Sequence, residues 1–280
     1  MAEEKIKPKK AKEEKFEAET EIDEEKLEVE KDIITEIPEV EKEVKPEVKI
    51  DVAAWKPKTA LGAKVKKGEI TDVDQVFEQG LAILEDEITD VLMPEIQTEL
   101  LMVGQSKGKF GGGSRRIFKQ TQKKTPEGNK PSFACMAVVG NVDGYVGLGY
   151  GKSKDTVPSR EKAIRNAKKN IFKIKRGCGS WQCSCQTPHS LPFAVEGKCG
   201  SVRIRLMPAP KGKGLCVEPE CAKILRLAGI KDVWSKTFGQ TRVKINLAFA
   251  TIAALKKLVK MKINPEMAKN VGLVDGRIKK

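Results

Sequence analysis

Three cysteines and the only histidine of the chain fall within twelve residues, in the segment GCGSWQCSCQTPH. Cys178, Cys183, Cys185 and His189 follow the spacing C-x4-C-x-C-x3-H. Thiolate sulfur and imidazole nitrogen are the ligands that a tetrahedral structural zinc ion prefers, and such an ion can hold a loop that is too small to own a core. The spacing lacks the familiar C-x2-C pair, so a linker with reduced thiols is the alternative to a zinc site.

The run VGLGYGKS at 146–153 has the look of a nucleotide-binding loop, but its spacing excludes one. A P-loop would need glycine at Val146, and a dinucleotide-binding loop that starts at Gly147 would need glycine at Lys152. The three alternate glycines instead predict an edge strand with one bare face, open to RNA or to another backbone. Lys152 and Lys154 would then bind phosphate at the end of this strand. Plain packing of the glycines in a sheet is the alternative.

Two more loops combine glycine with basic residues: Gly104–Arg116, and the turn Pro208–Gly214 with the sequence PAPKGKG. Guanidinium groups and backbone N–H groups in such loops can reach phosphate oxygens, whereas a merely solvated loop is the alternative. With the basic residues of a helix expected after the glycine run, they form one predicted RNA-binding set. Its members are Lys107, Lys109, Arg115, Arg116, Lys119, Lys152, Lys154, Arg160, Arg165, Lys168, Lys169, Lys175, Arg176, Lys211, Lys213, Lys236 and Arg242.

The residues offer little for catalysis. The sequence does not place His189 beside a serine and an acid, and no paired carboxylates stand in an apolar or glycine-rich setting that would separate their pKa values. We therefore predict that the protein is not an enzyme, with no catalytic residues. A zinc-dependent enzyme built on the cysteine segment is the alternative.

The charge of the chain indicates an anionic partner. The 280 residues carry a net charge of +14, but residues 1–50 hold 11 lysines and 18 acidic residues, so the remaining 230 residues carry +21. A field of this size attracts nucleic acid or an anionic membrane. No apolar run of about 18 residues and no secretory signal is present, so we expect a cytoplasmic protein without a membrane. Seven unevenly spaced cysteines indicate reduced thiols.

The first half of the chain predicts a small sheet covered by a helix. Strands are expected at 132–139 and 145–151, joined by a turn with Asp143-Gly144, and a helix is expected at 157–172. Strand fragments at 98–103 and 117–118 precede them, and 119–131 reads as a polar insertion. Upstream, residues 72–93 show the apolar spacing of one or two amphipathic helices, after a basic linker at 55–67.

The second half repeats the combination of strands and helices. Strands are expected at 193–196, 201–207 and 233–237, and helices at 219–227 and 243–258. The predicted organisation is a disordered tail over 1–50, linker and helices over 51–97, a first domain over 98–176, a cysteine-rich connector over 177–190, a second domain over 191–259 and a basic tail over 260–280.

Two long blocks resemble the universal small-subunit ribosomal protein five family, whose eukaryotic member is numbered two. AVVGNVDGYVGLGYGKSKDTVPSREKAIRNAKKN is similar to its amino-terminal signature, and GKCGSVRIRLMPAPKGKGL with LAGIKDVWSKTFGQTRVKIN is similar to its second domain. The resemblance covers about residues 72–258. The segment CGSWQCSC is similar to archaeal members in particular.

The resemblance implies an α+β fold: a double-stranded-RNA-binding-like βββα domain, followed by a two-layer α/β domain with a left-handed βαβ crossover. It also implies a structural protein of the small ribosomal subunit that binds rRNA near the decoding centre and the mRNA entry path and supports accurate translation. Implied neighbours are the small-subunit proteins numbered three, four and eight. In family members, a glycine loop that matches Lys109–Arg116 reaches into the rRNA.

Two features depart from the family pattern. Residues 119–131 interrupt a strand that should be continuous, so a longer hairpin with displaced loop contacts is expected there, and the acidic residues 1–50 have no counterpart. The main alternative to a ribosomal protein is a free double-stranded-RNA-binding regulatory protein.

Overall fold

The computed structural model describes residues 55–106 and 115–277. They belong to one compact unit that spans residues 50–280. The predicted disorder of residues 1–50 and the predicted RNA contacts of Lys107 and Lys109 lie outside the described residues. None of the helices within the described ranges is long and apolar enough to cross a membrane.

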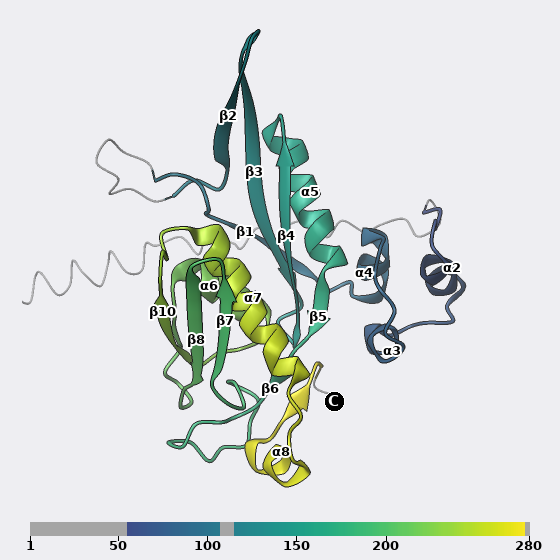
Figure 1. Ribbon diagram of the computed structural model, residues 1–280. Coiled ribbons are helices and arrows are strands. Elements are labelled where there is room, and N and C mark those ends of the chain that lie inside the picture. The colour runs from purple at the N-terminus through teal and green to yellow at the C-terminus, as the bar shows by residue number, and fades with distance from the viewer. Residues whose placement is uncertain (1–54, 107–114, 278–280) are drawn as a thin grey trace, which may run out of the picture. The chain divides into compact units, whose positions relative to one another are not determined.

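Five strands of the described residues form the first sheet, in the order β1-β3-β4-β5, with β2 also paired to β3. All of these pairings are antiparallel. Helix α5 lies along β3 and β4 (Figure 1). The elements are β1 (Gln97–Leu101), β2 (Lys119–Thr125), β3 (Gly128–Gly140), β4 (Tyr145–Ser153), α5 (Thr156–Lys169) and β5 (Ile171–Lys173). The predicted arrangement of a sheet with one covering helix is confirmed.

Helix α5 packs directly on the glycine face of β4. A β-carbon on Gly149 would lie 2.1 Å from the carbonyl oxygen of Ala163, and one on Gly151 would lie 2.2 Å from that of Ser159. Only glycine allows two backbones to approach this closely. The backbone of α5 therefore covers this face, which is not open to RNA and is occupied by packing. The expectation of an edge strand is wrong, because β4 lies between β3 and β5.

The polar segment 119–131 forms a hairpin rather than an irregular insertion. Strand β2 pairs with β3 from Lys119 opposite Ala134 to Thr125 opposite Gly128. Strand β4 pairs with β3 only from Phe133 onward, so the outer part of the hairpin extends past the rest of the sheet (Figure 1). This confirms the expectation of a longer hairpin.

The second sheet has the order β7-β8-β10-β9 within the described residues. Strands β9 and β10 are parallel, and α6 joins them as a βαβ unit, while α7 packs on β7 and β8. The elements are β7 (Val195–Cys199), β8 (Val202–Pro208), β9 (Leu215–Cys216), α6 (Pro219–Leu227), β10 (Val233–Phe238) and α7 (Lys244–Lys260). The prediction of a two-layer α/β arrangement is confirmed, and the protein is of the α+β class.

The two sheets share one hydrophobic core, which includes Met136 and Val138 of β3 and Ile224 and Leu227 of α6. The chain then returns to the connector between the sheets. Helix α8 (Pro265–Val271) leads to β11 (Val274–Asp275), which pairs with β6 (Lys175–Arg176). Part of the predicted basic tail is therefore structured.

Three short helices precede the first sheet: α2 (Ala60–Lys67), α3 (Val73–Glu78) and α4 (Asp86–Leu92). The last two confirm the predicted amphipathic helices. Helix α2 occupies residues that the sequence indicated as a linker; Thr59 caps its start and Gly68 its end, and its Leu61 and Val65 are buried with residues of α3 and α4.

Candidate nucleic-acid interface and metal centre

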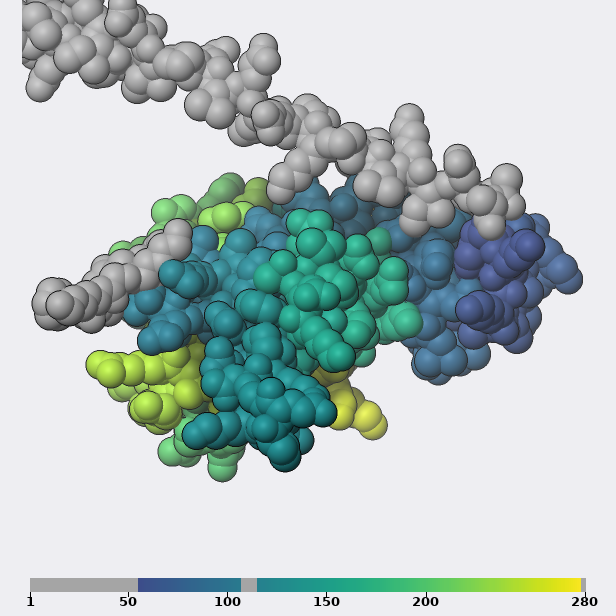
Figure 2. Space-filling model, turned by 90° about the horizontal axis from the view of Figure 1, so that it is seen from above, coloured from purple at the N-terminus to yellow at the C-terminus, as the bar shows by residue number. Residues whose placement is uncertain are grey.

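The β2–β3 hairpin carries exposed lysines, and among the described residues no third strand pairs with its outer part. They are Lys119, Lys123, Lys124 and Lys130. In Figure 2, which looks down on this end, the teal atoms of the hairpin and of α5 lie in front. Of these four, only Lys119 belongs to the RNA-binding set predicted from the sequence. The charge of the insertion was the available signal for the other three, because its four lysines are opposed by Glu127 alone.

A second basic group lies where β4 ends and α5 begins. Lys152 and Lys154 follow the glycine run and are exposed, and Arg160 is exposed on the first turns of α5. Arg165, one helical turn further, is exposed but lies 3.7 Å from a carboxylate oxygen of Asp86. These predicted residues are therefore exposed around the end of β4 and along α5.

Several predicted RNA-binding residues instead serve the fold. Lys168 donates to Asp90 at 2.6 Å, and both side chains are mostly buried, so the pair holds α5 to α4. Burial raises the pKa of Asp90, although the hydrogen bond from Lys168 acts in the opposite direction. The ammonium of Lys175 donates to the carbonyl oxygens of Val259 and Met261. Lys169 is half-buried.

Arg176 is a correction to the predicted set. Its side chain is only 4% exposed, and its guanidinium group pairs with Asp143 and donates to the carbonyl oxygens of Gly229 and Gly276. These partners come from three separate parts of the chain. Because a buried guanidinium group needs such compensation, Arg176 joins the two halves of the fold and cannot reach RNA.

The loop 104–116 is described only at its base. Gly104 donates to the carbonyl oxygen of Arg116 at 2.8 Å, and the backbone of Arg115 pairs with that of Ser106. The Arg115 side chain is half-buried and contacts the carbonyl oxygen of Gly104 at 3.5 Å, whereas Arg116 is exposed. At the base of the loop, Arg116 is therefore exposed to solvent, whereas the Arg115 side chain lies against the backbone of Gly104.

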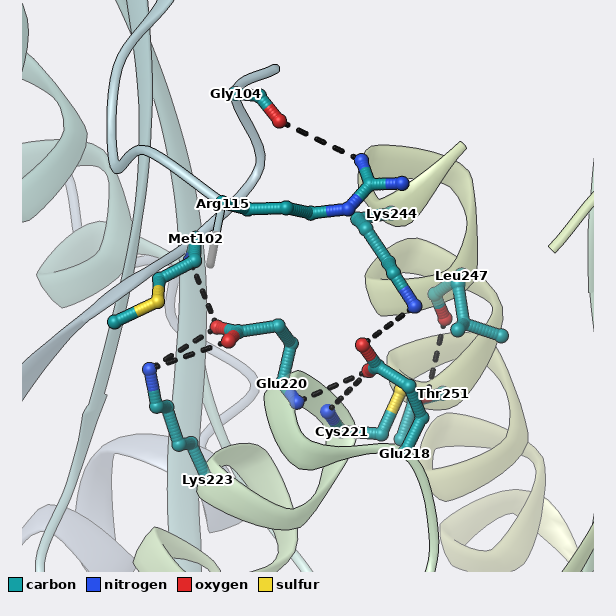
Figure 3. A network of polar contacts seen from close by, with 10 residues as sticks. All are labelled: Met102, Gly104, Arg115, Glu218, Glu220, Cys221, Lys223, Lys244, Leu247 and Thr251. Atoms are coloured by element: carbon teal, nitrogen blue, oxygen red, sulfur yellow. Dashed lines mark hydrogen bonds and ion pairs between the residues drawn. The ribbon is translucent and has the colours of Figure 1, made fainter. Parts of the chain in front are cut away.

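Glu220 holds the start of this loop to the second sheet. Its buried carboxylate accepts a 2.7 Å hydrogen bond from the backbone of Met102 and lies 3.1 Å from the ammonium of Lys223. On the same helix, Glu218 caps the first turn of α6 and pairs with Lys244 of α7 (Figure 3). The position of the loop base therefore depends on α6.

The turn 208–214 presents its two lysines to solvent. Lys211 and Lys213 are both exposed, and Gly212 and Gly214 adopt positive φ angles of 86° and 75°. Further along, Lys236 and Arg242 are also exposed, and Lys236 lies over the ring of Phe238. All of these predicted residues are accessible to an anionic partner.

The four predicted metal ligands converge. The thiol sulfurs of Cys178, Cys183 and Cys185 and a ring nitrogen of His189 lie within 4.8 Å of one another. Nε2 of His189 is 3.9 Å from the Cys183 sulfur, and Nδ1 is 2.8 Å from a carboxylate oxygen of Asp232. Sulfurs bound to a tetrahedral zinc ion at about 2.3 Å are about 3.8 Å apart, so the donor set fits zinc once its most distant atoms draw together by about 1 Å.

The thiols of this cluster differ in acidity. Burial raises the pKa of the Cys178 thiol to about 11, whereas a hydrogen bond from Thr187 lowers the pKa of the half-buried Cys185 thiol to about 6. Cys183, His189 and Asp232 contact one another in the same order as the cysteine, histidine and acid of a nucleophilic triad. Here two more sulfurs converge on the same point, which is typical of a metal centre.

Comparisons with known proteins identify relatives over most of the chain. Residues 117–175 match the family model "Ribosomal protein S5, N-terminal domain", and residues 197–270 match "Ribosomal protein S5, C-terminal domain". A small ribosomal subunit protein uS5 of Nanoarchaeum equitans is 48% identical over 82% of this chain and 98% of its own length. One of Methanocaldococcus jannaschii is 44% identical over 82% of this chain and its full length.

Proposed function

The chain belongs to the small ribosomal subunit protein uS5 family, in its archaeal type, and on this premise we propose that it is a structural constituent of the small ribosomal subunit that binds rRNA. The observation that carries the proposal is identity of 41–48% with named uS5 proteins, which it matches over 94–100% of their length. The protein acts in the ribosome, in the cytoplasm, and not as an enzyme.

Four surfaces would bind the RNA backbone in this proposal. They are the base of the loop 104–116, the β2–β3 hairpin, the end of β4 with the start of α5, and the turn 208–214, all of which expose lysine or arginine. A folded RNA presents phosphates from several directions, and separate basic elements on a rigid body can neutralise them together. The family resemblance supports a position near the decoding centre and the mRNA entry path, beside the small-subunit proteins numbered three, four and eight.

The loop base offers a direct test of RNA binding. We expect Arg115→Ala with Arg116→Ala to weaken binding of the full-length protein to small-subunit rRNA, and to reduce the slope of log affinity against log salt by about one to two. Filter binding or fluorescence anisotropy across a salt series measures both quantities.

The matched control removes two lysines that are exposed on α2 and lie outside the proposed surfaces, Lys64→Ala with Lys67→Ala. It has the same change in net charge. Equal slopes for the two double variants would remove the loop base from the proposed contacts.

Sedimentation separates a ribosomal constituent from a free double-stranded-RNA-binding regulatory protein. A constituent travels with the small subunit through a sucrose gradient at moderate salt, because many phosphate contacts act at once. Recovery of the protein only at the top of the gradient would support the free regulatory protein instead.

We also propose that the Cys/His cluster holds one structural zinc ion. Three thiolates and one imidazole fill a tetrahedral coordination sphere, so no position would remain for a reacting water molecule. Such an ion supplies stability to the connector rather than chemistry. Metal analysis of the purified protein, with Cys183→Ser and Cys185→Ser as the comparison, tests this role.

A further inference from the structure

One buried carboxylate lies between the Cys/His cluster and the basic turn 208–214. Asp232 accepts from Nδ1 of His189 with one oxygen, at 2.8 Å, and from the backbone of Gly214 with the other, at 2.7 Å. The side chains of His189 and Asp232 are only 6% and 5% exposed. The last residue of the turn is therefore two hydrogen bonds away from a ligand of the cluster.

The first part of the turn is held from the same place. The hydroxyl oxygen of Ser190, the residue after His189, accepts from the backbone of Ala209 at 3.2 Å, and this hydroxyl also bonds to the carbonyl oxygen of Asp232. The carbonyl oxygen of His189 accepts from the backbones of Lys231 and Asp232. Both ends of the segment 209–214 are thus hydrogen-bonded to Ser190 and Asp232, which lie next to the candidate ligand His189.

A metal ion would make this arrangement more rigid. Coordination through Nε2 requires that Nδ1 carry the proton, and the Nδ1–H group then donates to Asp232, which fixes the tautomer and the orientation of the ring. Asp232 needs these donors because its carboxylate is buried. Without the ion, the imidazole keeps its bond to Asp232 and a 3.9 Å contact with the Cys183 sulfur, but the cysteine loop loses its common centre.

We propose that the zinc centre orders the turn 208–214 through His189, Asp232 and Ser190, so that metal binding and RNA binding by Lys211 and Lys213 are coupled. The inference rests on the proposed zinc site and on the proposed RNA contact of the turn. A turn that is already ordered loses less conformational entropy when it binds phosphate. Asp232 is in this view a positioning residue that touches neither the metal nor the RNA.

A double-mutant cycle on the full-length protein tests the coupling. In the zinc-loaded protein, Lys211→Ala with Lys213→Ala is expected to weaken binding to small-subunit rRNA by roughly three- to tenfold at low salt. In the background of Asp232→Asn, the same two changes are expected to cost less than about twofold, because the turn is already loose and contributes little. An asparagine cannot accept from both His189 and Gly214 with its amide group.

Two further variants keep the test independent of protein folding. Ser190→Ala removes only the hydroxyl group that bonds to Ala209 and Asp232. In this background, the loss of RNA affinity caused by the two lysine changes is expected to be intermediate. Glu196→Gln removes a carboxylate from an exposed position of β7, has the same change in charge as Asp232→Asn, and is expected to leave the full three- to tenfold cost.

Hydrogen exchange gives a readout that RNA affinity does not. Removal of zinc, or Asp232→Asn, is expected to speed exchange of the backbone amides of Ala209 and Gly214, while those of the distant β2–β3 hairpin stay unchanged.

The results of these experiments distinguish the metal site, the RNA binding and the coupling between them. Absence of zinc would overturn the metal site and with it the coupling. Absence of RNA binding would overturn the proposed function. With zinc and RNA both bound, an equal cost of the lysine changes in every background would overturn the coupling alone.

Discussion

Single atoms decide whether α5 can lie on the first sheet. A β-carbon at Gly149 would lie 2.1 Å from the carbonyl oxygen of Ala163 and 2.2 Å from the backbone nitrogen of Ala167. Both neighbours are backbone atoms of one helix, so they cannot move aside independently. The glycines of this strand are therefore needed for packing, and only the exposed Lys152 and Lys154 that follow them are accessible to RNA.

Gly149→Ala is expected to lower the free energy of unfolding by about 2–3 kcal/mol or more, because the helix must move away from the sheet. Urea unfolding measures the loss. Lys152→Ala, an exposed change on the same strand, serves as the control and should stay within about 0.5 kcal/mol. Similar losses in both variants would contradict the packing argument.

Glu220 makes a contact that connects the two sheets. Glu220→Ala is expected to destabilise the protein by about 2–4 kcal/mol, because the Met102 N–H and the Lys223 ammonium each lose a buried partner. Glu220→Gln retains an acceptor for Met102 and should cost less. Equilibrium unfolding compares the three proteins, and a loss of the same size in both variants would assign the effect to the charge rather than to the Met102 bond.

At the scale of elements, the sequence predicts the helices and strands whose apolar residues recur with the period of a helix or of a strand. Strand β8 and helix α6 were expected at 201–207 and 219–227 and lie at 202–208 and 219–227, because alternating or helical burial leaves a clear pattern. Strand β2 has no such pattern, because six of its seven residues are exposed, and only the comparison with the family pattern suggested a longer hairpin there. Its pairing with β3, and not the burial of its own side chains, determines its structure.

The candidate site shows the same limit. The four metal ligands are close in sequence, so their spacing predicted the cluster. Asp232 is 43 residues from His189, and no local pattern could connect them. Likewise, Arg176 is buried by contacts with Gly229 and Gly276, which are distant in sequence. Its charge, the only local signal, suggested a surface position instead.

Glu85 ties the segment before α2 to α4. It accepts from the indole of Trp55 and from the backbones of Lys58 and Thr59. Partial burial favours its protonated form, but these hydrogen bonds outweigh that effect and lower the pKa of Glu85. A carboxylate with a lowered folded-state pKa stabilises the fold above its ordinary pKa of about 4.3, and this stabilisation is lost as the pH falls through the folded-state value.

Glu85→Gln is therefore expected to lower the unfolding temperature at pH 7 and to have little effect near pH 2–3, where the wild-type carboxyl group is also neutral. Thermal unfolding across this pH range measures the difference. Glu78→Gln, at an exposed position of the neighbouring helix α3, is the control. A difference between Glu85→Gln and wild type that does not depend on pH would rule out the carboxylate as its source.

At the scale of the whole molecule, charge is divided unequally along the chain. Residues 1–50 carry −7, and residues 51–280 carry +21. We expect removal of residues 1–50 to strengthen binding to unrelated RNA at low salt and to steepen its salt dependence, because the acidic segment competes with phosphates for the basic surfaces. Anisotropy with a poly-U probe measures both effects. Unchanged affinity would mean that the acidic residues do not screen the body.

The pairing of β6 with β11 has a consequence for biosynthesis. Residues 175–176 leave the exit tunnel about a hundred residues before Gly276, whose carbonyl oxygen accepts from the Arg176 guanidinium group. A nascent chain can form both sheets and their shared core before that partner is made, but the bond to Gly276 and the β6–β11 pairing, which close the connector, form only when translation has passed residue 276. A prematurely released product would keep its sheets and lack this closure, which gives proteolytic quality control a feature by which to distinguish it from the finished protein.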